Sequence, residues 1–243
     1  MRDYARETAE RVAFIRSVMA DAHAHALVFA NSGGKDCALV GILCKLACED
    51  TLSIMMPCHS KRNYEEDLSD AAALCEQFGI ESITVDLTAT REAMLSAIGL
   101  SQDVTPEAVS NIAPRLRMAV DYAVAQSRGA LVAGTGNRSE TYVGYFTKWG
   151  DGAYDFNPIY DLTVTEVYEF LDYLNAPENI RRKAPSAGLF EGQTDEGQLG
   201  VTYRQIDDVI LTGQTDDPAA REKIERYHRA TAHKRTDPPR YGA

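Results

Sequence analysis

The stretch LVFANSGGKDC at residues 27–37 constrains the fold of this chain more than any other. Residues 27–30 are apolar and predict a short buried strand, the Ser32-Gly33-Gly34 run interrupts it, and a helix is predicted from Asp36 onward. Such a turn forms an anion site, because free backbone N–H groups and the positive end of the helix dipole face it. The glycines let the backbone approach a phosphate closely, Lys35 adds positive charge, and Asp36 can hold a metal ion that bridges phosphates.

The rest of the first half alternates between strand and helix patterns. Helical segments separate the apolar runs and join them at the spacing of βαβ units. This pattern predicts a doubly wound parallel sheet with helices on both faces and ligands bound beyond the carboxyl ends of the strands. The loops expected there are residues 31–36, 57–62 and 134–140. The further predicted strands are 51–56, 80–87 and 130–133, and the helices between them are 36–48, 63–78, 88–98 and 105–128, the last with a break near Pro114.

The second half is less regular. A capping box at residues 163–166 opens a helix, and residues 203–211 and 218–230 predict further C-terminal helices. Residues 181–200 are rich in glycine, proline and charge, which predicts a mobile loop that closes as a lid.

Composition narrows the class of protein. With 243 residues and 44% hydrophobic content, the chain is expected to form one domain over residues 1–243. A net charge of −11 argues against a general nucleic-acid surface. No apolar run is long enough to cross a bilayer, and the charged N-terminus lacks the apolar core of a signal peptide. We therefore expect a cytoplasmic protein without a nucleic-acid or membrane partner, whose five cysteines are free thiols.

Besides the stretch at residues 27–37, three more segments contain polar side chains suited to binding or catalysis. GTGNRSE at residues 134–140 follows the fourth strand, so Glu140 can join Asp36 around one Mg²⁺; the alternative is a surface loop with an N-capping threonine. FTKWGDGAYDFNP at residues 146–158 sets a lysine among glycines and aspartates; the alternative is a hairpin at the Asp151-Gly152 turn. In the fourth segment, NIAPRLRM, two arginines stand two positions apart, so a helix presents only one of them to the site.

Together with KAPSAGL at residues 183–189 and AHKR at residues 232–235, these segments resemble the ammonia-dependent NAD synthetases, which are ATP pyrophosphatases with an SGGxDS loop. The resemblance implies an adenine nucleotide α-hydrolase-like fold. It also implies a reaction in which the carboxylate of deamido-NAD attacks the α-phosphate of ATP and pyrophosphate leaves. Ammonia then displaces AMP from the adenylate, which gives NAD. The family further implies a homodimer that shares the deamido-NAD site.

The resemblance also assigns roles to residues. Asp36 and Glu140 would hold Mg²⁺, and Asp36 and Asp151 would be catalytic. Asp151 would orient or deprotonate ammonium, because only neutral ammonia attacks the adenylate. The ATP contacts would come from Ala30, Asn31, Ser32, Gly33, Gly34, Lys35, Asp36, Cys37, Thr135 and Ser186. The deamido-NAD contacts would come from Arg115, Lys148, Asp155, His233 and Lys234.

Two departures from the family pattern weaken the assignment to ATP. Cys37 stands where the family has a serine, and its thiol is a weaker hydrogen-bond donor. At a helix N-terminus a thiolate is favoured, which predicts redox sensitivity. Val164 stands where the family has a lysine directed at the ATP phosphates. Lys35 or the basic residues 181–183 are the candidates that compensate.

Some members of the family carry a glutaminase domain. Only 26 residues precede the first predicted strand here, so we expect free ammonia, or ammonia from a separate partner, as the donor. Two alternatives stay open: a paralogue that binds nucleotide without turnover, and an ATP pyrophosphatase with another acceptor, as in GMP synthetases or tRNA-modifying enzymes.

Overall fold

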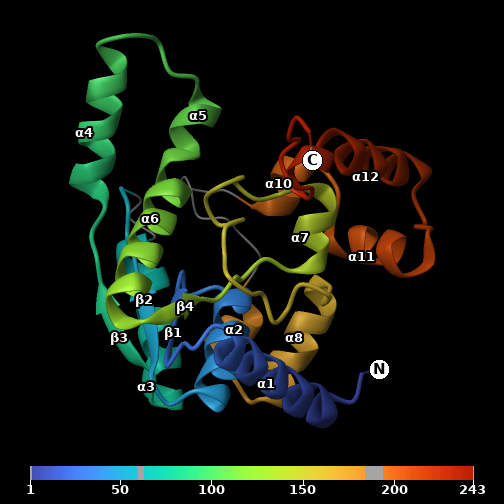
Figure 1. Ribbon diagram of the computed structural model, residues 1–243. Helices are drawn as coiled ribbons and strands as arrows, with labels where there is room; N and C mark the ends of the chain where they lie inside the picture. The colour runs from blue at the N-terminus through green and yellow to red at the C-terminus, as the bar shows by residue number, and fades with distance from the viewer. Residues whose placement is uncertain (1, 60–62, 184–193, 243) are drawn as a thin grey trace.

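A parallel sheet forms the centre of the computed structural model, which describes residues 2–59, 63–183 and 194–242 (Figure 1). Its strands lie in the order β3-β2-β1-β4, with Ala30 beside Ile54 and Val28 beside Val132. Each strand overlaps one of the predicted strand segments. The strands are β1 (Ala26–Ala30), β2 (Thr51–Met55), β3 (Glu81–Thr84) and β4 (Ala130–Val132).

Helices cover both faces of this sheet, as the sequence predicts. Leu27 and Phe29 of β1 face a core formed with α1 (Tyr4–Asp21), α2 (Lys35–Ala47), α3 (Leu68–Phe78) and α8 (Val164–Tyr173). Val28 points the other way and packs in a second core with α6 (Ile112–Arg128). Successive side chains of a strand alternate between its faces, so a fully apolar strand is buried on both.

Local signals in the sequence set several helix ends. Gly79 and Gly129 close α3 and α6 in the left-handed conformation, which glycine adopts without a steric cost. The break predicted near Pro114 lies at Asn111, between α5 (Pro106–Ser110) and α6. Pro114 instead occupies the first turn of α6, where its missing N–H removes no helical hydrogen bond. The helix that precedes α5 is α4 (Thr88–Gly99), and a π-helical turn (Asn63–Asp67) precedes α3.

The C-terminal helices form a separate group, drawn in orange and red in Figure 1. Ile206 and Ile224 are fully buried in a third apolar cluster, which also contains Val143 and Val164. The predicted capping box joins Thr163 and Glu166 at the start of α8. The elements of this half are α7 (Arg138–Val143), α9 (Glu178–Arg182), α10 (Asp195–Leu199), α11 (Tyr203–Thr212), α12 (Pro218–Ala230) and a 3₁₀ turn (Ala232–Lys234).

The predicted loop at residues 181–200 is helical at both of its ends, which was not expected. Residues 181–182 close α9 and residues 195–199 form α10. Residues 184–193 lie outside the described part of the chain, so the lid remains a prediction. Within the described residues, no helix combines the length and the apolar character that a membrane crossing requires.

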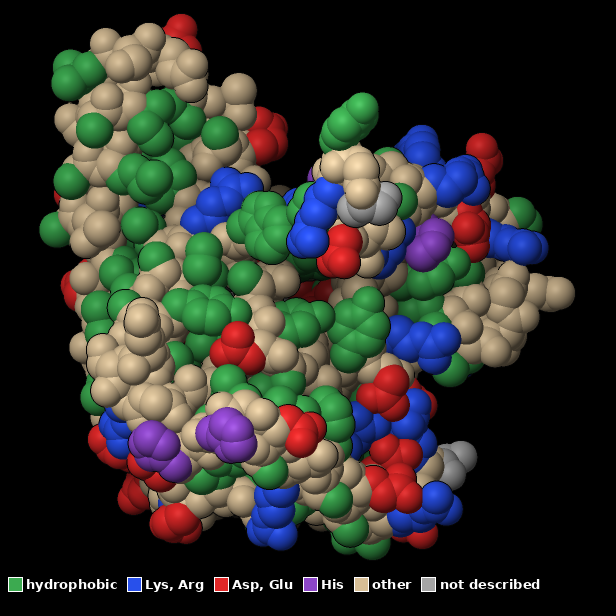
Figure 2. All heavy atoms as spheres, in the orientation of Figure 1, with side chains coloured by type: hydrophobic (Ala, Val, Ile, Leu, Met, Phe, Trp, Pro, Cys, Tyr) green, Lys and Arg blue, Asp and Glu red, His purple; other side chains and the backbone are tan. Residues whose placement is uncertain are grey.

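An arm made of α4, α5 and the start of α6 projects beyond the sheet (Figure 1). None of the residues of α4 is buried, and Met94 and Leu100 are among the large apolar side chains that remain exposed. Figure 2 shows hydrophobic side chains gathered on this arm.

The strand order places a crevice between β1 and β4. From β1 the chain proceeds to β2 and β3 on one side, and then returns to β4 on the other side of β1. In open parallel sheets a ligand binds at such a reversal, outside the carboxyl ends of the strands. The loops that follow β1 and β4 therefore flank one site.

We predict that Gly33→Ala destabilises the protein more than Gly79→Ala does. Both glycines have positive φ angles, +69° at Gly33 and +63° at Gly79, so alanine costs about 1 kcal/mol at each on this ground alone. A Cβ at Gly33 would also collide with the carbonyl oxygen of Asp67, whereas nothing lies within 4 Å of one at Gly79. Urea unfolding of the two variants measures the difference, and equal losses would contradict the close contact at Gly33.

Candidate active site

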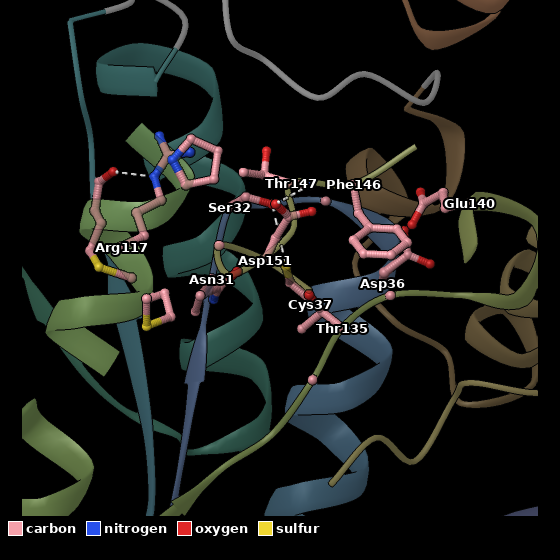
Figure 3. A pocket seen from close by; sticks show the side chains of 18 of the residues that line it. Asn31, Ser32, Asp36, Cys37, Arg117, Thr135, Glu140, Phe146, Thr147 and Asp151 are labelled. Carbon is pink, nitrogen blue, oxygen red and sulfur yellow. Dashed lines mark hydrogen bonds between the residues drawn. The ribbon is translucent and has the colours of Figure 1, made fainter. Parts of the chain in front are cut away.

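A cavity of about 410 Å³ opens at the carboxyl ends of β1, β2 and β4 (Figure 3). Much of the ATP set expected from the sequence lines it: Ala30, Asn31, Ser32, Gly34, Lys35, Asp36, Cys37 and Thr135. Glu140, Asp151 and Lys234 line it as well. In Figure 3, Asp36 and Glu140 lie together on one side, Arg117 lies on the opposite side, and Asp151 lies between them.

The glycine loop is held open by Asn31. Its side-chain oxygen accepts a hydrogen bond from the backbone N–H of Gly33 at 3.0 Å, and its amide nitrogen donates to Ser53 at 3.0 Å. Asn31 is buried, while Ser32 is exposed. The loop therefore keeps a fixed shape without using the N–H groups of the α2 N-terminus, which remain available to an anion.

The loops after β1 and β4 meet at a cluster of charged side chains. The Lys35 Nζ lies 2.7 Å from Asp36 Oδ2 and 3.4 Å from Glu140 Oε1. Asn137 donates to Asp36 Oδ1 at 3.0 Å and accepts from the N–H of Glu140 at 2.9 Å. Asn137 is thus the N-cap of α7, so the threonine cap considered from the sequence is wrong.

Burial affects the pKa values of two charged side chains of this cluster. The side chains of Lys35, Asp36 and Glu140 are 6%, 13% and 18% exposed. Burial and the neighbouring Asp36 carboxylate raise the pKa of Glu140. Burial alone would lower the pKa of Lys35, but Asp36 and Glu140 outweigh it and the pKa is raised. A pair of carboxylates this close favours a cation between them.

The donor set fits Mg²⁺. Two carboxylates face the same space, and Mg²⁺ is usually held by one or two carboxylates together with phosphate oxygens. Among the described residues, no group of three or more His, Cys, Asp or Glu side chains forms a metal cage of its own. Asp36 and Glu140 are therefore suited to a metal that arrives with a phosphate ligand.

Asp151 lies in a tight turn over the cavity. Its Oδ1 accepts from the N–H of Thr147 at 3.0 Å, and the Thr147 hydroxyl donates to Asn111 at 2.6 Å. The surrounding protein raises the pKa of Asp151, against the opposing effects of the Thr147 N–H and of Lys234, although the carboxyl is open to the cavity. Residues 148–152 form consecutive turns and not a hairpin, so that alternative is wrong.

Four of the residues expected at deamido-NAD gather at the rim. Arg115 donates to the carbonyl of Lys148 at 3.4 Å, and Lys148 Nζ donates to the carbonyl of His233 at 2.7 Å. Lys234 donates to the carbonyls of Gly144 at 2.8 Å and Phe146 at 2.6 Å, and it alone of the four lines the cavity.

The fifth residue expected at deamido-NAD is Asp155, and Ser186 belongs to the set expected at ATP. Asp155 accepts from the N–H of Val132 at 2.8 Å and from the hydroxyl of Tyr122 at 3.3 Å, outside the cavity lining. Ser186 lies outside the described residues.

The two residues that depart from the family pattern, Cys37 and Val164, are both buried. Cys37 is 8% exposed, and burial raises the pKa of its thiol. The expectation of a thiolate is therefore wrong, because burial outweighs the helix dipole. Val164 is 4% exposed in the third apolar cluster and does not line the cavity. The cations that line the cavity in the described part of the chain are Lys35, Arg117, Lys183 and Lys234.

Comparison with known proteins agrees with this geometry. The family model for NAD synthase matches residues 7–238. The chain is also 44% identical over 235 residues to an NH₃-dependent NAD⁺ synthetase of Carboxydothermus hydrogenoformans, covering 96% of this chain and 95% of that one. The chain belongs to the NAD synthase family. The match confirms the resemblance and the fold class predicted from the sequence.

Two solved structures extend this comparison. An NMN synthetase from Francisella tularensis has a TM-score of 0.93 and 34% identity, with 100% of both chains covered. An NH₃-dependent NAD synthetase from Campylobacter jejuni has a TM-score of 0.80 and 29% identity, with 99% of both chains covered. The NAD synthase fold of this chain therefore occurs in enzymes named for two different nicotinamide nucleotides.

Sequence reasoning missed several residues of this NAD synthase site. Asn137 was visible as an N-cap residue type before a helix, with an acid three positions later. Lys183 was already a candidate for compensating charge, but nothing in the sequence predicted its pairing with Asp67 at 2.8 Å and Asp70 at 2.6 Å. Asp121 carried no local signal, because α6 turns it inward only in the folded protein.

Asp121 gives a prediction on stability against pH. Burial raises its pKa to about 7, although Arg117 acts in the opposite direction. A carboxyl that binds its proton more tightly in the folded state stabilises that state only at low pH. The stability is lost as pH rises from about 4, where the unfolded group titrates, to about 7.

Asp121→Asn should therefore gain stability relative to the unsubstituted protein across this pH range. Chemical denaturation at a series of pH values measures the difference between the two free energies of unfolding. A difference that does not change with pH would contradict the raised pKa.

Proposed function

We propose that this chain is the ligase that converts deamido-NAD, ATP and ammonia to NAD, AMP and pyrophosphate through an adenylated intermediate. The observation that carries the proposal is the meeting of the glycine loop with the buried Asp36 and Glu140 carboxylates at the crevice between β1 and β4. Membership of the NAD synthase family supplies the substrates.

The glycine loop would bind the pyrophosphate end of ATP, with Thr135 on the opposite loop and Ser186 as a further contact. Asp36 and Glu140 would hold Mg²⁺, which would neutralise negative charge on the phosphates. The backbone N–H groups at the start of α2 supply fixed donors that cost no reorganisation during the reaction.

Lys35 would supply the phosphate-directed charge that Val164 cannot. It is buried at the cavity wall, and it already holds together the two carboxylates proposed for the metal. Occupation of that space by Mg²⁺ would release the Lys35 ammonium toward the phosphates. Lys183 would remain paired with Asp67 and Asp70 at the wall beside Gly33.

Asp151 would take the proton of ammonium. Its raised pKa makes it a better proton acceptor than an ordinary carboxylate, and the Thr147 N–H fixes its orientation. The resulting ammonia would attack the carbonyl carbon of the adenylate, and AMP would leave with the oxygen that came from the carboxylate.

A second compound is a candidate for the carboxylate substrate that is amidated. The NMN synthetase from Francisella tularensis has a higher TM-score than the NAD synthetase from Campylobacter jejuni, 0.93 against 0.80. Amidation that yields NMN requires nicotinic acid mononucleotide. A mononucleotide would leave unused part of the rim at Arg115, Lys148, His233 and Lys234, where we place the contacts to deamido-NAD other than that of Asp155.

Assembly and location also remain proposals. The exposed apolar side chains on the α4 arm, including Met94 and Leu100, support a homodimer through this arm. We place the enzyme in the cytoplasm, where its nucleotide substrates are made.

We predict that the purified protein forms NAD from ATP, Mg²⁺ and deamido-NAD with ammonium chloride, and not with glutamine. A parallel assay with nicotinic acid mononucleotide should give a lower kcat/KM. A higher kcat/KM for the mononucleotide would establish the second candidate. Nucleotide binding without AMP formation for either acceptor would contradict both.

Lys35→Gln should raise the KM for ATP and lower the stability of the metal-free protein, because two buried carboxylates lose their counter-ion. Removing one partner of a buried ion pair costs about 3–5 kcal/mol as an upper range. Mg²⁺ should raise the unfolding temperature of this variant more than that of the unsubstituted protein, because the metal no longer competes with the lysine.

The matched control is Lys45→Gln on the same helix, where the lysine pairs with the exposed Glu49 at 2.6 Å. It should leave the KM for ATP and the response to Mg²⁺ unchanged. An equal response to Mg²⁺ in both variants would place the metal elsewhere.

Asp151→Asn should lower kcat for NAD formation by about 10²–10⁴-fold, because proton acceptance from ammonium is lost. Formation of the adenylate should persist, and a rapid-quench experiment should detect one pyrophosphate per active site. The control is Asp50→Asn: Asp50 directly precedes β2, at the amino end of that strand, and does not line the cavity. Loss of the pyrophosphate burst in Asp151→Asn would assign Asp151 to the first step.

A further inference from the structure

One end of the cavity is an apolar slot away from the charged cluster. Ile54 and Met56 at the end of β2, Val132 of β4 and Met118 of α6 line it. The first three are 0%, 5% and 3% exposed. In Figure 3 this end is marked by Arg117, across the cavity from Asp36 and Glu140. A nucleoside triphosphate with its phosphates at the glycine loop would thus place its base in this slot.

A single carboxyl interrupts the apolar wall. Asp121 is 5% exposed and lines the cavity, and its Oδ1 has no hydrogen-bond partner among the described residues. Leaving a buried polar group unpaired costs about 1–3 kcal/mol, more for a charged group. A fold that needed only a wall here would be more stable with an apolar side chain, so the carboxyl indicates a missing partner.

The neighbouring polar groups do not supply that partner. Arg117, one turn earlier on α6, donates through its Nε to the carbonyl of Met56 at 3.1 Å. No ion pair joins it to Asp121 in the described part of the chain, although its charge acts on that carboxyl. The Met56 carbonyl is therefore occupied, while Asp121, three positions after Met118 on the same face of α6, is the free acceptor at the slot.

We propose that Asp121 selects the base of the nucleoside triphosphate by accepting a hydrogen bond from the 6-amino group of adenine. The proposal rests on the proposed use of ATP. Hypoxanthine and guanine carry an oxygen at position 6. At a pH above about 7, where Asp121 is ionised, this oxygen would face the carboxylate oxygen without a hydrogen between them. A site built to accept from an amino group rejects an analogue that lacks it, because its own buried acceptor is then left unpaired.

The test compares ATP with ITP, which differs from it only in the group at position 6 and its ring proton. We expect the unsubstituted protein to prefer ATP in kcat/KM for pyrophosphate release with the acceptor present. Asp121→Leu should reduce the ATP-to-ITP ratio by about tenfold, the value of one good hydrogen bond. Asp121→Asn should raise the use of ITP, because its amide N–H can donate to the oxygen at position 6.

Stability gives a second readout that separates recognition from a structural role. Asp121→Leu should unfold at a temperature equal to or above that of the unsubstituted protein, because it removes a buried unpaired carboxyl. Asp207→Asn is the matched control: Asp207 is also buried, but it accepts from Ser139 and Thr165 outside the cavity lining. This control should lower stability and leave the nucleotide ratio unchanged.

Equal ATP-to-ITP ratios in the unsubstituted protein, Asp121→Leu and Asp121→Asn would overturn the proposal. So would a lower unfolding temperature of Asp121→Leu with its ratio intact. Calorimetric titration with ATP and with ITP, without the acceptor, measures the affinity for each nucleotide independently of turnover. A preference for ATP in binding that Asp121→Leu loses, in a protein without ligase activity, would support the base selection and contradict only the proposed reaction.

Discussion

The repulsion between two buried carboxylates is the constraint on which this site depends. Asp36 lies in the first turn of α2, which follows β1, and Glu140 lies in α7, which follows β4, so the strand order brings them together. Lys35 lies between them, and Asn137 bonds to both loops. The cluster therefore fixes the two halves of the crevice relative to each other, and any phosphate ligand or metal must bind against this arrangement.

We propose that Lys35 supplies the phosphate-directed charge that Val164 cannot. In the family pattern, the charge directed at the phosphates stands at the start of α8. Here that position belongs to an apolar cluster with Val143 and Ile206, while a buried lysine stands on α2. The positive charge thus reaches the same crevice from the glycine loop, and the start of α8 contributes packing between the sheet and the C-terminal helices.

Local patterns predicted the parts of this structure that depend on local physics. The four strands, the Gly79 helix end and the Thr163 capping box were all predicted correctly, because burial period, backbone freedom and capping act over a few residues. The inward position of Asp121 and the pairing of Lys183 with Asp67 and Asp70 depend on contacts between distant elements. Cys37 was misjudged for the same reason, since its burial by the fold outweighs the helix dipole.

The most direct test of the account follows the oxygen atoms of the acceptor. Deamido-NAD labelled with ¹⁸O in its carboxylate is converted with ATP and ammonium, and the AMP and pyrophosphate are weighed by mass spectrometry. Attack of the carboxylate on the α-phosphate predicts one ¹⁸O atom in each AMP and none in pyrophosphate. Unlabelled AMP, or ADP as the product, would contradict an adenylated intermediate and with it the function assigned to the crevice.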